Sequence, residues 1–142
     1  MQKICDTFCG PAFNKEYYDL AVLALRLVVG FAFVYHGWMK VGNMEGAVTM
    51  FSGMGIGATL TYVAAGVEFF GGLALMFGAL TKLASGLLAI FMIAAIYLVH
   101  LSKGYSMSAG GYEYQLLLLV AVIFFGLVGP GKYAAHEYIC KK

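Results

Sequence analysis

Four long apolar segments constrain this chain more than any other feature of its sequence. They run over about residues 20–39, 60–80, 83–101 and 112–128. A helix needs about 20 residues, with a range of roughly 17–25, to cross the hydrocarbon core of a bilayer. All four segments are that long, the last by a small margin. Lipid cannot satisfy an open backbone, and the alternating pattern of barrel strands is missing. We therefore predict an all-α fold, an integral membrane four-helix bundle.

The composition points the same way and excludes several classes of protein. Of the 142 residues, 62% are hydrophobic and only 11% are charged, and the mean hydropathy is +0.85. A soluble domain carries about 25% charged residues. A soluble enzyme and a disordered chain are therefore excluded. The net charge of +2 offers no phosphate-binding surface, so the expected partner is the lipid bilayer and not a nucleic acid.

The lysines near the helix ends predict the orientation. With four crossings, both ends of the chain lie on one side of the membrane, and lysine and arginine favour the cytoplasmic side. The opposite side carries only Lys40 and Lys103. The side of the termini carries six lysines: Lys3, Lys15, Lys82, Lys132, Lys141 and Lys142. We therefore expect both termini in the cytoplasm.

The expected organisation is a membrane domain, residues 20–129, between cytoplasmic segments 1–19 and 130–142. Acidic residues precede the first apolar segment and Arg26 interrupts it, so we expect it to remain in the mature protein. The outward loop 41–59 is rich in glycine and methionine. It fits an adaptable lid or a re-entrant segment, and equally an ordinary flexible loop.

The three cysteines are too few for a disulfide framework. Cys5 and Cys9 would lie one turn apart if their segment were helical. A redox or metal role for this pair stays open beside that of two free thiols, because no histidine or further cysteine nearby completes a site. Cys140 lies near the other end of the chain.

Two opposite charges fall deep inside the apolar segments. Arg26 lies in the first segment and Glu68 in the second. A buried charge costs a few kcal/mol, roughly 2.5–3.5 on insertion scales, so such residues turn inward and pair. At about 1.5 Å of rise per residue, their depths differ by about 9 Å, which long side chains nearly bridge. We predict an Arg26–Glu68 ion pair, which either serves function or only locks two helices together.

Four further ionisable residues fall at similar depth near the outer face. They are His36, Lys40, His100 and Glu113. Together with Glu68 they are the candidate catalytic residues. Histidine titrates near neutral pH and neighbouring carboxylates set its charge, so a pocket of this kind suits proton-coupled chemistry at the membrane surface.

A quinone head group fits such a pocket. Its two carbonyl oxygens need hydrogen-bond donors, its reduction needs a proton route, and its tail needs lipid. The expected cofactor-binding residues are His36, His100 and Tyr114. Haem bound by His36 and His100, or another metal, is the competing interpretation. No compact motif such as His-Glu-x-x-His supports a metal, so no metal ligand is assigned.

These residues and their neighbours resemble the DoxX family over about residues 23–138. The resemblance rests on Arg26, on His100 and on five short motifs in the right order. The motifs are His36-Gly37-Trp38-Met39-Lys40, Glu68-Phe69-Phe70-Gly71-Gly72, Gly78-Ala79-Leu80-Thr81-Lys82, Gly110-Gly111-Tyr112-Glu113-Tyr114 and Gly129-Pro130-Gly131-Lys132-Tyr133.

The resemblance implies a multi-pass four-helix protein of a bacterial or archaeal inner membrane, linked to thiosulfate:quinone oxidoreduction and to membrane redox complexes. We therefore expect a small subunit of a quinone-linked oxidoreductase system, with other subunits or further copies of itself as partners. The alternative is a non-catalytic scaffold or assembly factor of a redox complex. Residues 1–19 depart from the family pattern and fit either contact with a cytoplasmic partner or a solvated tail.

Overall fold

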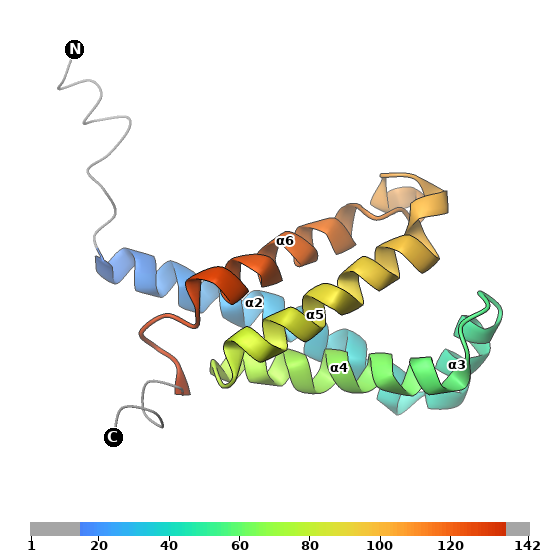
Figure 1. Ribbon diagram of the computed structural model, residues 1–142, viewed down its shortest axis with the longest axis horizontal. Coiled ribbons are helices and arrows are strands. Elements are labelled where there is room, and N and C mark those ends of the chain that lie inside the picture. Colours follow the sequence, from blue (N-terminus) through green and yellow to red (C-terminus); the bar gives the residue numbers. More distant parts are fainter. Residues whose placement is uncertain (1–14, 136–142) are drawn as a thin grey trace, which may run out of the picture.

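The computed structural model describes residues 15–135, and within that range every regular element is a helix (Figure 1). The cysteines at positions 5, 9 and 140 lie outside the described residues. The elements are α2 (Lys15–Gly42), α3 (Met44–Ser52), α4 (Ala58–Phe77), α5 (Thr81–Ala95), the π-helical turn η1 (Ile96–His100), the 3-10 turns η2 (Leu101–Lys103) and η3 (Met107–Ala109), and α6 (Glu113–Val128). The predicted all-α fold is confirmed.

The helices form two pairs. α2 packs along α4, and α5 packs along α6, while α4 and α5 join the pairs and α2 touches α6 only lightly. Figure 1 shows the start of α2, the α4–α5 turn and the end of α6 at one end of the bundle, here called the terminal end. At the opposite end, the loop end, α3 and η1 to η3 diverge. The pairs are therefore closed together at one end and splayed at the other.

Small residues bring α2 and α4 into close contact. A Cβ atom added at Gly72 would lie 2.8 Å from the carbonyl oxygen of Gly30. Near the loop end, a Cβ at Gly37 would lie 2.5 Å from the backbone nitrogen of Phe69. Real Cβ atoms do not come that close, so only glycine allows this approach. These contacts fix how the two helices align along their lengths.

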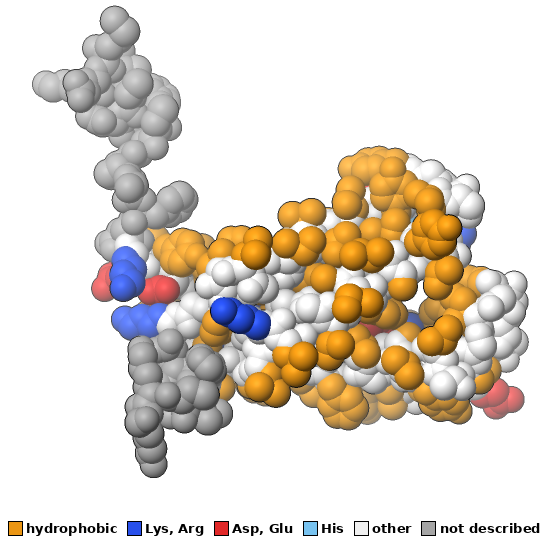
Figure 2. Space-filling view, in the orientation of Figure 1, with side chains coloured by type: hydrophobic (Ala, Val, Ile, Leu, Met, Phe, Trp, Pro, Cys, Tyr) orange, Lys and Arg blue, Asp and Glu red, His pale blue; other side chains and the backbone are white. Residues whose placement is uncertain are grey.

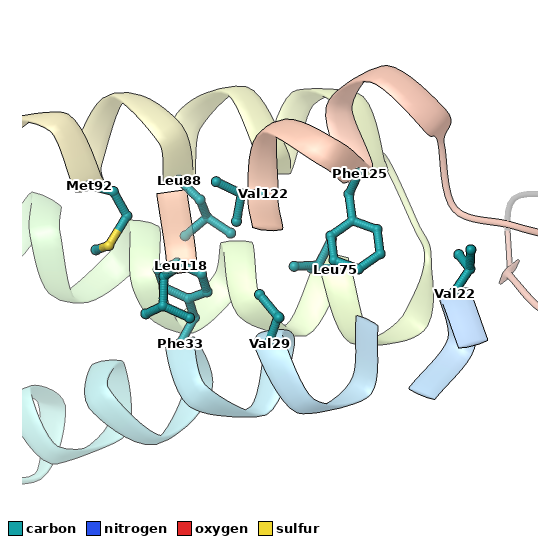
Figure 3. Packing of buried hydrophobic residues seen from close by; sticks show 9 residues of the cluster. All are labelled: Val22, Val29, Phe33, Leu75, Leu88, Met92, Leu118, Val122 and Phe125. Atoms are coloured by element: carbon teal, nitrogen blue, oxygen red, sulfur yellow. The ribbon is translucent and has the colours of Figure 1, made fainter. Parts of the chain in front are cut away.

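One apolar core joins all four long helices, and Figure 3 shows its side chains directed toward one another between the helices. Its members are Val22, Val29 and Phe33 of α2, Leu75 of α4, Leu88 and Met92 of α5, and Leu118, Val122 and Phe125 of α6. The outward faces are also apolar, with Val28 and Phe70 each 69% and Leu127 80% exposed. A chain that is apolar both inside and outside is a membrane protein, whose outer faces contact lipid.

Three helices of the described range are long and apolar enough to cross a membrane: Lys15–Gly42, Ala58–Phe77 and the continuous stretch Thr81–Lys103. α6 is equally apolar but has only 16 residues. At about 1.5 Å per residue it is about 24 Å long, short of the roughly 30 Å hydrocarbon core. A helical membrane bundle is thus confirmed, whereas a fourth crossing and cytoplasmic termini stay predictions.

The turn between α4 and α5 differs in place from the sequence expectation. α4 ends at Phe77, not near residue 80, because Gly78 adopts a left-handed conformation with φ of 67°. Leu80 is also left-handed, with φ of 49°, and α5 already begins at Thr81. The Gly78 conformation suits a residue without Cβ and ends the helix through hydrogen bonds to Ala74 and Leu75.

The segment expected as a loop, 41–59, is largely helical. α2 continues to Gly42, and α3 follows after a single residue. The side chain of Asn43 accepts a hydrogen bond from the Gly46 backbone at 3.1 Å and so caps α3. α3 then packs against the beginning of α4. The segment is therefore not an unstructured loop.

Candidate functional site

An ion pair between α2 and α4 lies near the loop end. Lys40 Nζ donates a hydrogen bond to Glu68 Oε2, and the two side chains are only 15% and 6% exposed. Gly37 explains this pairing, because it lies one turn before Lys40 and contacts Phe69, the residue after Glu68. The glycine contact aligns the helices so that the two charges meet.

The expected Arg26–Glu68 ion pair is wrong, because both residues have other partners. Arg26 lies 14 residues before Lys40 on α2, about 21 Å along the helix axis, beyond the reach of a carboxylate bonded to Lys40. Arg26 Nη1 instead donates to the Pro130 carbonyl oxygen at 3.0 Å, and Nη2 donates to the Tyr133 carbonyl oxygen. The depth estimated from the segment ends did not predict these partners, because it contains no information on how α2 and α4 align along their lengths.

Arg26 thus belongs to the terminal end and has a structural role there. Arg26 is only 1% exposed, and its guanidinium group holds the chain that follows α6 against α2. Gly78 makes room for it, because a Cβ atom there would overlap the guanidinium. Among the described residues no carboxylate contacts Arg26, so its charge is stabilised by backbone carbonyl dipoles.

His36 lies on the exposed side of α2 and meets α6. The centroid of its ring is 6.0 Å from that of Tyr114 and 5.8 Å from that of Tyr35, which stands at a near right angle to it. Tyr35 is 52% exposed, so this aromatic group faces the surroundings of the bundle. His36 and Tyr114, both expected to bind a cofactor, are thus in ring contact, while their binding of a cofactor stays a prediction.

His100 lies in the π-helical end of the third long helix and is bonded at both ring nitrogens. Nδ1 is 2.7 Å from the carbonyl oxygen of Gly110, and Nε2 is 3.1 Å from the side-chain nitrogen of Gln115. Because α5 passes into a π turn at Ile96, the helix end is widened where it carries His100. A haem iron at Nε2 of His100 would have to displace Gln115, whereas the Nδ1 bond to a backbone carbonyl is one that metal-bound histidines also make, so the haem interpretation stays open.

Glu113 fastens the connection between η3 and α6. Its Oε2 accepts a hydrogen bond from the backbone N–H of Met107 at 3.0 Å, and its own N–H donates to the Tyr105 carbonyl oxygen. The rings of Tyr105 and Tyr112 also meet edge to face at 5.6 Å. The side chain of Glu113 is thus engaged in ordering its own loop.

The first turn of α6 is the point where these groups converge. Tyr114 contacts His36 of α2, Gln115 contacts His100, and Glu113 holds the preceding loop. In residues 15–135, no hydrogen bond or ion pair joins the Lys40–Glu68 pair to either histidine. Figure 2 shows the surface hollowed between the diverging ends of the helix pairs, with charged side-chain atoms visible in its depth.

Sequence reasoning missed two residues of this site. Gln115 has a detectable signal, since it is an isolated amide in an otherwise apolar segment. Gly37 stands in one of the motifs that carry the DoxX resemblance, but its packing role appears only where α4 comes within contact distance. Within the described part of the chain, no group of three or more histidine, cysteine or acidic residues is placed to hold a metal ion.

Comparisons with known proteins give consistent results. The DoxX sequence profile matches residues 21–101. The chain is 32% identical over 128 residues to a Bacillus subtilis protein named "Putative oxidoreductase CatD", covering 90% of this chain and 92% of that protein. It is 26% identical over 128 residues to the Escherichia coli "Inner membrane protein YqjF", covering 90% of this chain and 98% of that protein. No solved structure matches the chain.

Proposed function

The chain belongs to the DoxX family, and we propose that it is a small membrane subunit of a quinone-linked oxidoreductase system. In this proposal the polar groups at the loop end bind the quinone head group and exchange protons with it. The observation that carries the proposal is the Lys40–Glu68 ion pair, enclosed between two membrane helices. The B. subtilis relative's name supports an oxidoreductase link, and the E. coli relative's name supports an inner-membrane location.

The ion pair is costly as a purely structural element. Removing two charges from water costs several kcal/mol per ion, roughly what their attraction returns, so hydrophobic residues would serve stability as well. Ionisable residues within membrane helices usually mark ligand or proton pathways. Lys40 has three N–H donors, of which one is bonded to Glu68, so it can also donate to a quinone carbonyl oxygen.

In this proposal, the groups beside Lys40 exchange protons with the bound quinone. Glu68 holds a carboxylate where a proton can reside, and Lys40 stabilises its charge. His36 stands at the exposed edge of α2, where its ring faces Tyr114. A head group between these residues has its isoprenoid tail in the bilayer, because the surrounding side chains are apolar and exposed. The electrons would come from or go to a partner subunit with its own redox cofactor.

Quinone binding to the purified protein in nanodiscs tests this proposal. Calorimetric titration with a short-chain ubiquinone or menaquinone analogue compares the wild type with Lys40→Met, His36→Ala and the double variant Lys40→Met/Glu68→Gln. We expect micromolar binding by the wild type and at least a tenfold loss in each Lys40 variant, since about 1.4 kcal/mol corresponds to a factor of ten. His36→Ala should weaken binding without lowering the unfolding temperature.

The double variant serves as the matched control. Lys40→Met alone strands a buried carboxylate and destabilises the fold, whereas the double variant removes both charges and should restore stability. Binding that stays lost in the stable double variant supports a ligand role. If none of the variants changes quinone affinity while assembly with partner proteins fails, the scaffold alternative is favoured instead.

A further inference from the structure

The two hydrogen bonds of His100 determine the state of its ring. The carbonyl oxygen of Gly110 can only accept, so the Nδ1 atom 2.7 Å away carries the proton. A neutral imidazole has one donor and one acceptor, which makes Nε2 the acceptor. The group that approaches Nε2 at 3.1 Å must therefore be the donating NH2 of Gln115. The Gly110 carbonyl oxygen thus determines which nitrogen of His100 is protonated, and that tautomer determines the orientation of the Gln115 amide.

This chain of bonds leaves one atom unused. With its NH2 directed at His100, the Gln115 amide turns its oxygen Oε1 to the other side. That oxygen is buried and has no hydrogen-bond partner among the described residues. Buried carbonyl groups almost always have a partner, and leaving one unpaired is costly. Gln115 therefore presents an anchored acceptor that lacks a donor.

We propose that the Gln115 side-chain oxygen accepts a hydrogen bond from the hydroxyl group of a bound quinol, so that the site prefers the reduced over the oxidised quinone. The inference rests on the proposed function and names the redox form that the site selects. A quinol has O–H donors, while a quinone has only carbonyl acceptors. A quinone carbonyl facing Oε1 would bring two acceptors together and satisfy neither.

The position of Gln115 suits this role. The preceding residue, Tyr114, meets the ring of His36, so the same turn of α6 reaches both histidines. The segment 101–110, which carries the Gly110 acceptor, is exposed throughout, and the Gln115 residue as a whole is only partly buried. Quinol binding therefore requires that the buried oxygen Oε1 become accessible to the ligand hydroxyl from this end of the bundle.

Binding of both redox forms tests the inference. Under anaerobic conditions, the protein in nanodiscs is titrated with a short-chain quinol and with the matching quinone. We expect the wild type to bind the quinol about tenfold more tightly, the effect of one buried hydrogen bond and one avoided acceptor–acceptor contact. Gln115→Leu, of similar size but without polar atoms, should bind both forms equally. Gln115→Glu keeps an oxygen acceptor, but its carboxylate can bond His100 only when Nε2 carries a second proton, so its preference for the quinol should appear together with a doubly protonated His100.

Nitrogen chemical shifts of the histidine side chains provide an independent measurement of the anchoring. The wild type should show His100 protonated at Nδ1, and Gln115→Leu should remain folded with the Gly110 bond intact. Equal binding of both forms by the wild type, or an unchanged preference in Gln115→Leu, would overturn the role of Gln115 while quinone binding itself stands. Binding of neither form would overturn the proposed function together with this inference.

Discussion

The two ends of the bundle each bury a cation, and they stabilise it in different ways. At the terminal end, Arg26 is bonded to the carbonyl oxygens of Pro130 and Tyr133, which cannot change their charge. At the loop end, Lys40 is bonded to Glu68, whose carboxylate can take up a proton. A cation held by backbone dipoles is a structural fastening, whereas one held by a titratable partner leaves room for chemistry. Burial alone therefore does not distinguish a structural cation from one in a candidate site.

The largest effect should follow from removing the Arg26 fastening. Arg26→Met leaves two carbonyl oxygens without their donors, at about 1–3 kcal/mol each, so we expect a loss of about 3 kcal/mol of unfolding free energy. Thermal unfolding in nanodiscs measures it. Quinone affinity of the folded fraction should be unchanged, because the loop end lies at the opposite end of α2. A large loss of affinity with little loss of stability would reverse the roles assigned to the two ends.

An intermediate effect should follow from separating α2 and α4 at the loop end. Gly37→Ala places a Cβ 2.5 Å from the Phe69 backbone nitrogen, so the helices must move apart. We expect a loss of about 1–3 kcal/mol, as for other overpacked contacts, and a weakened Lys40–Glu68 pair. The matched control is Gly66→Ala in α4, where nothing lies within 4 Å.

Gly66→Ala should stabilise the helix by up to about 1 kcal/mol, because alanine is the better helix former. Thermal unfolding and quinone titration of both variants give the comparison. Equal behaviour of the two alanine variants would show that the Gly37 contact does not set the ion pair.

The smallest effect should follow from loosening the loop that precedes α6. Glu113→Gln weakens the charge-assisted bond to the Met107 backbone N–H, and we expect a loss of only about 0.5–1 kcal/mol because the bond is exposed. Hydrogen exchange of the Met107 amide should become faster, while the amides of α2 and α4 stay protected. Exchange that accelerates throughout the bundle would mean that Glu113 supports the whole fold.

Much of the fold was predictable because its signal is local. An apolar run of sufficient length forms a helix in lipid whatever its neighbours are, so the four segments were found within a few residues of their ends. The helix boundaries differed from the prediction where the conformation of a single residue ended or began a helix. The left-handed Gly78 ended α4 early, and the Asn43 cap made α3 a helix where a loop was expected.

The candidate site was predictable as a set of residues and not as a set of contacts. Lys40 and Glu68 were both selected from the sequence, yet Glu68 was paired with Arg26 and not with Lys40. His100 was selected as well, but not its bond to Gln115 at the start of α6. That bond depends on the shape of the connection between the two residues, which the sequence does not reveal. The depth of a residue in the membrane gives its position along one axis only. It does not give the direction in which its side chain points around the helix or how neighbouring helices align.

The sequence by itself determined that this protein is a helical membrane protein and that a few polar residues lie within its apolar helices. Hydrophobic length and the cost of unpaired backbone in lipid are enough for that conclusion. Only the tertiary structure decided which of those residues meet. The glycine contacts align α2 with α4, and the chain after α6 returns to Arg26. A side-chain bond forms within about 3 Å, and a shift of one residue along a helix moves a group by 1.5 Å and turns it by about 100°, so the pairing depends on alignment that only packing sets.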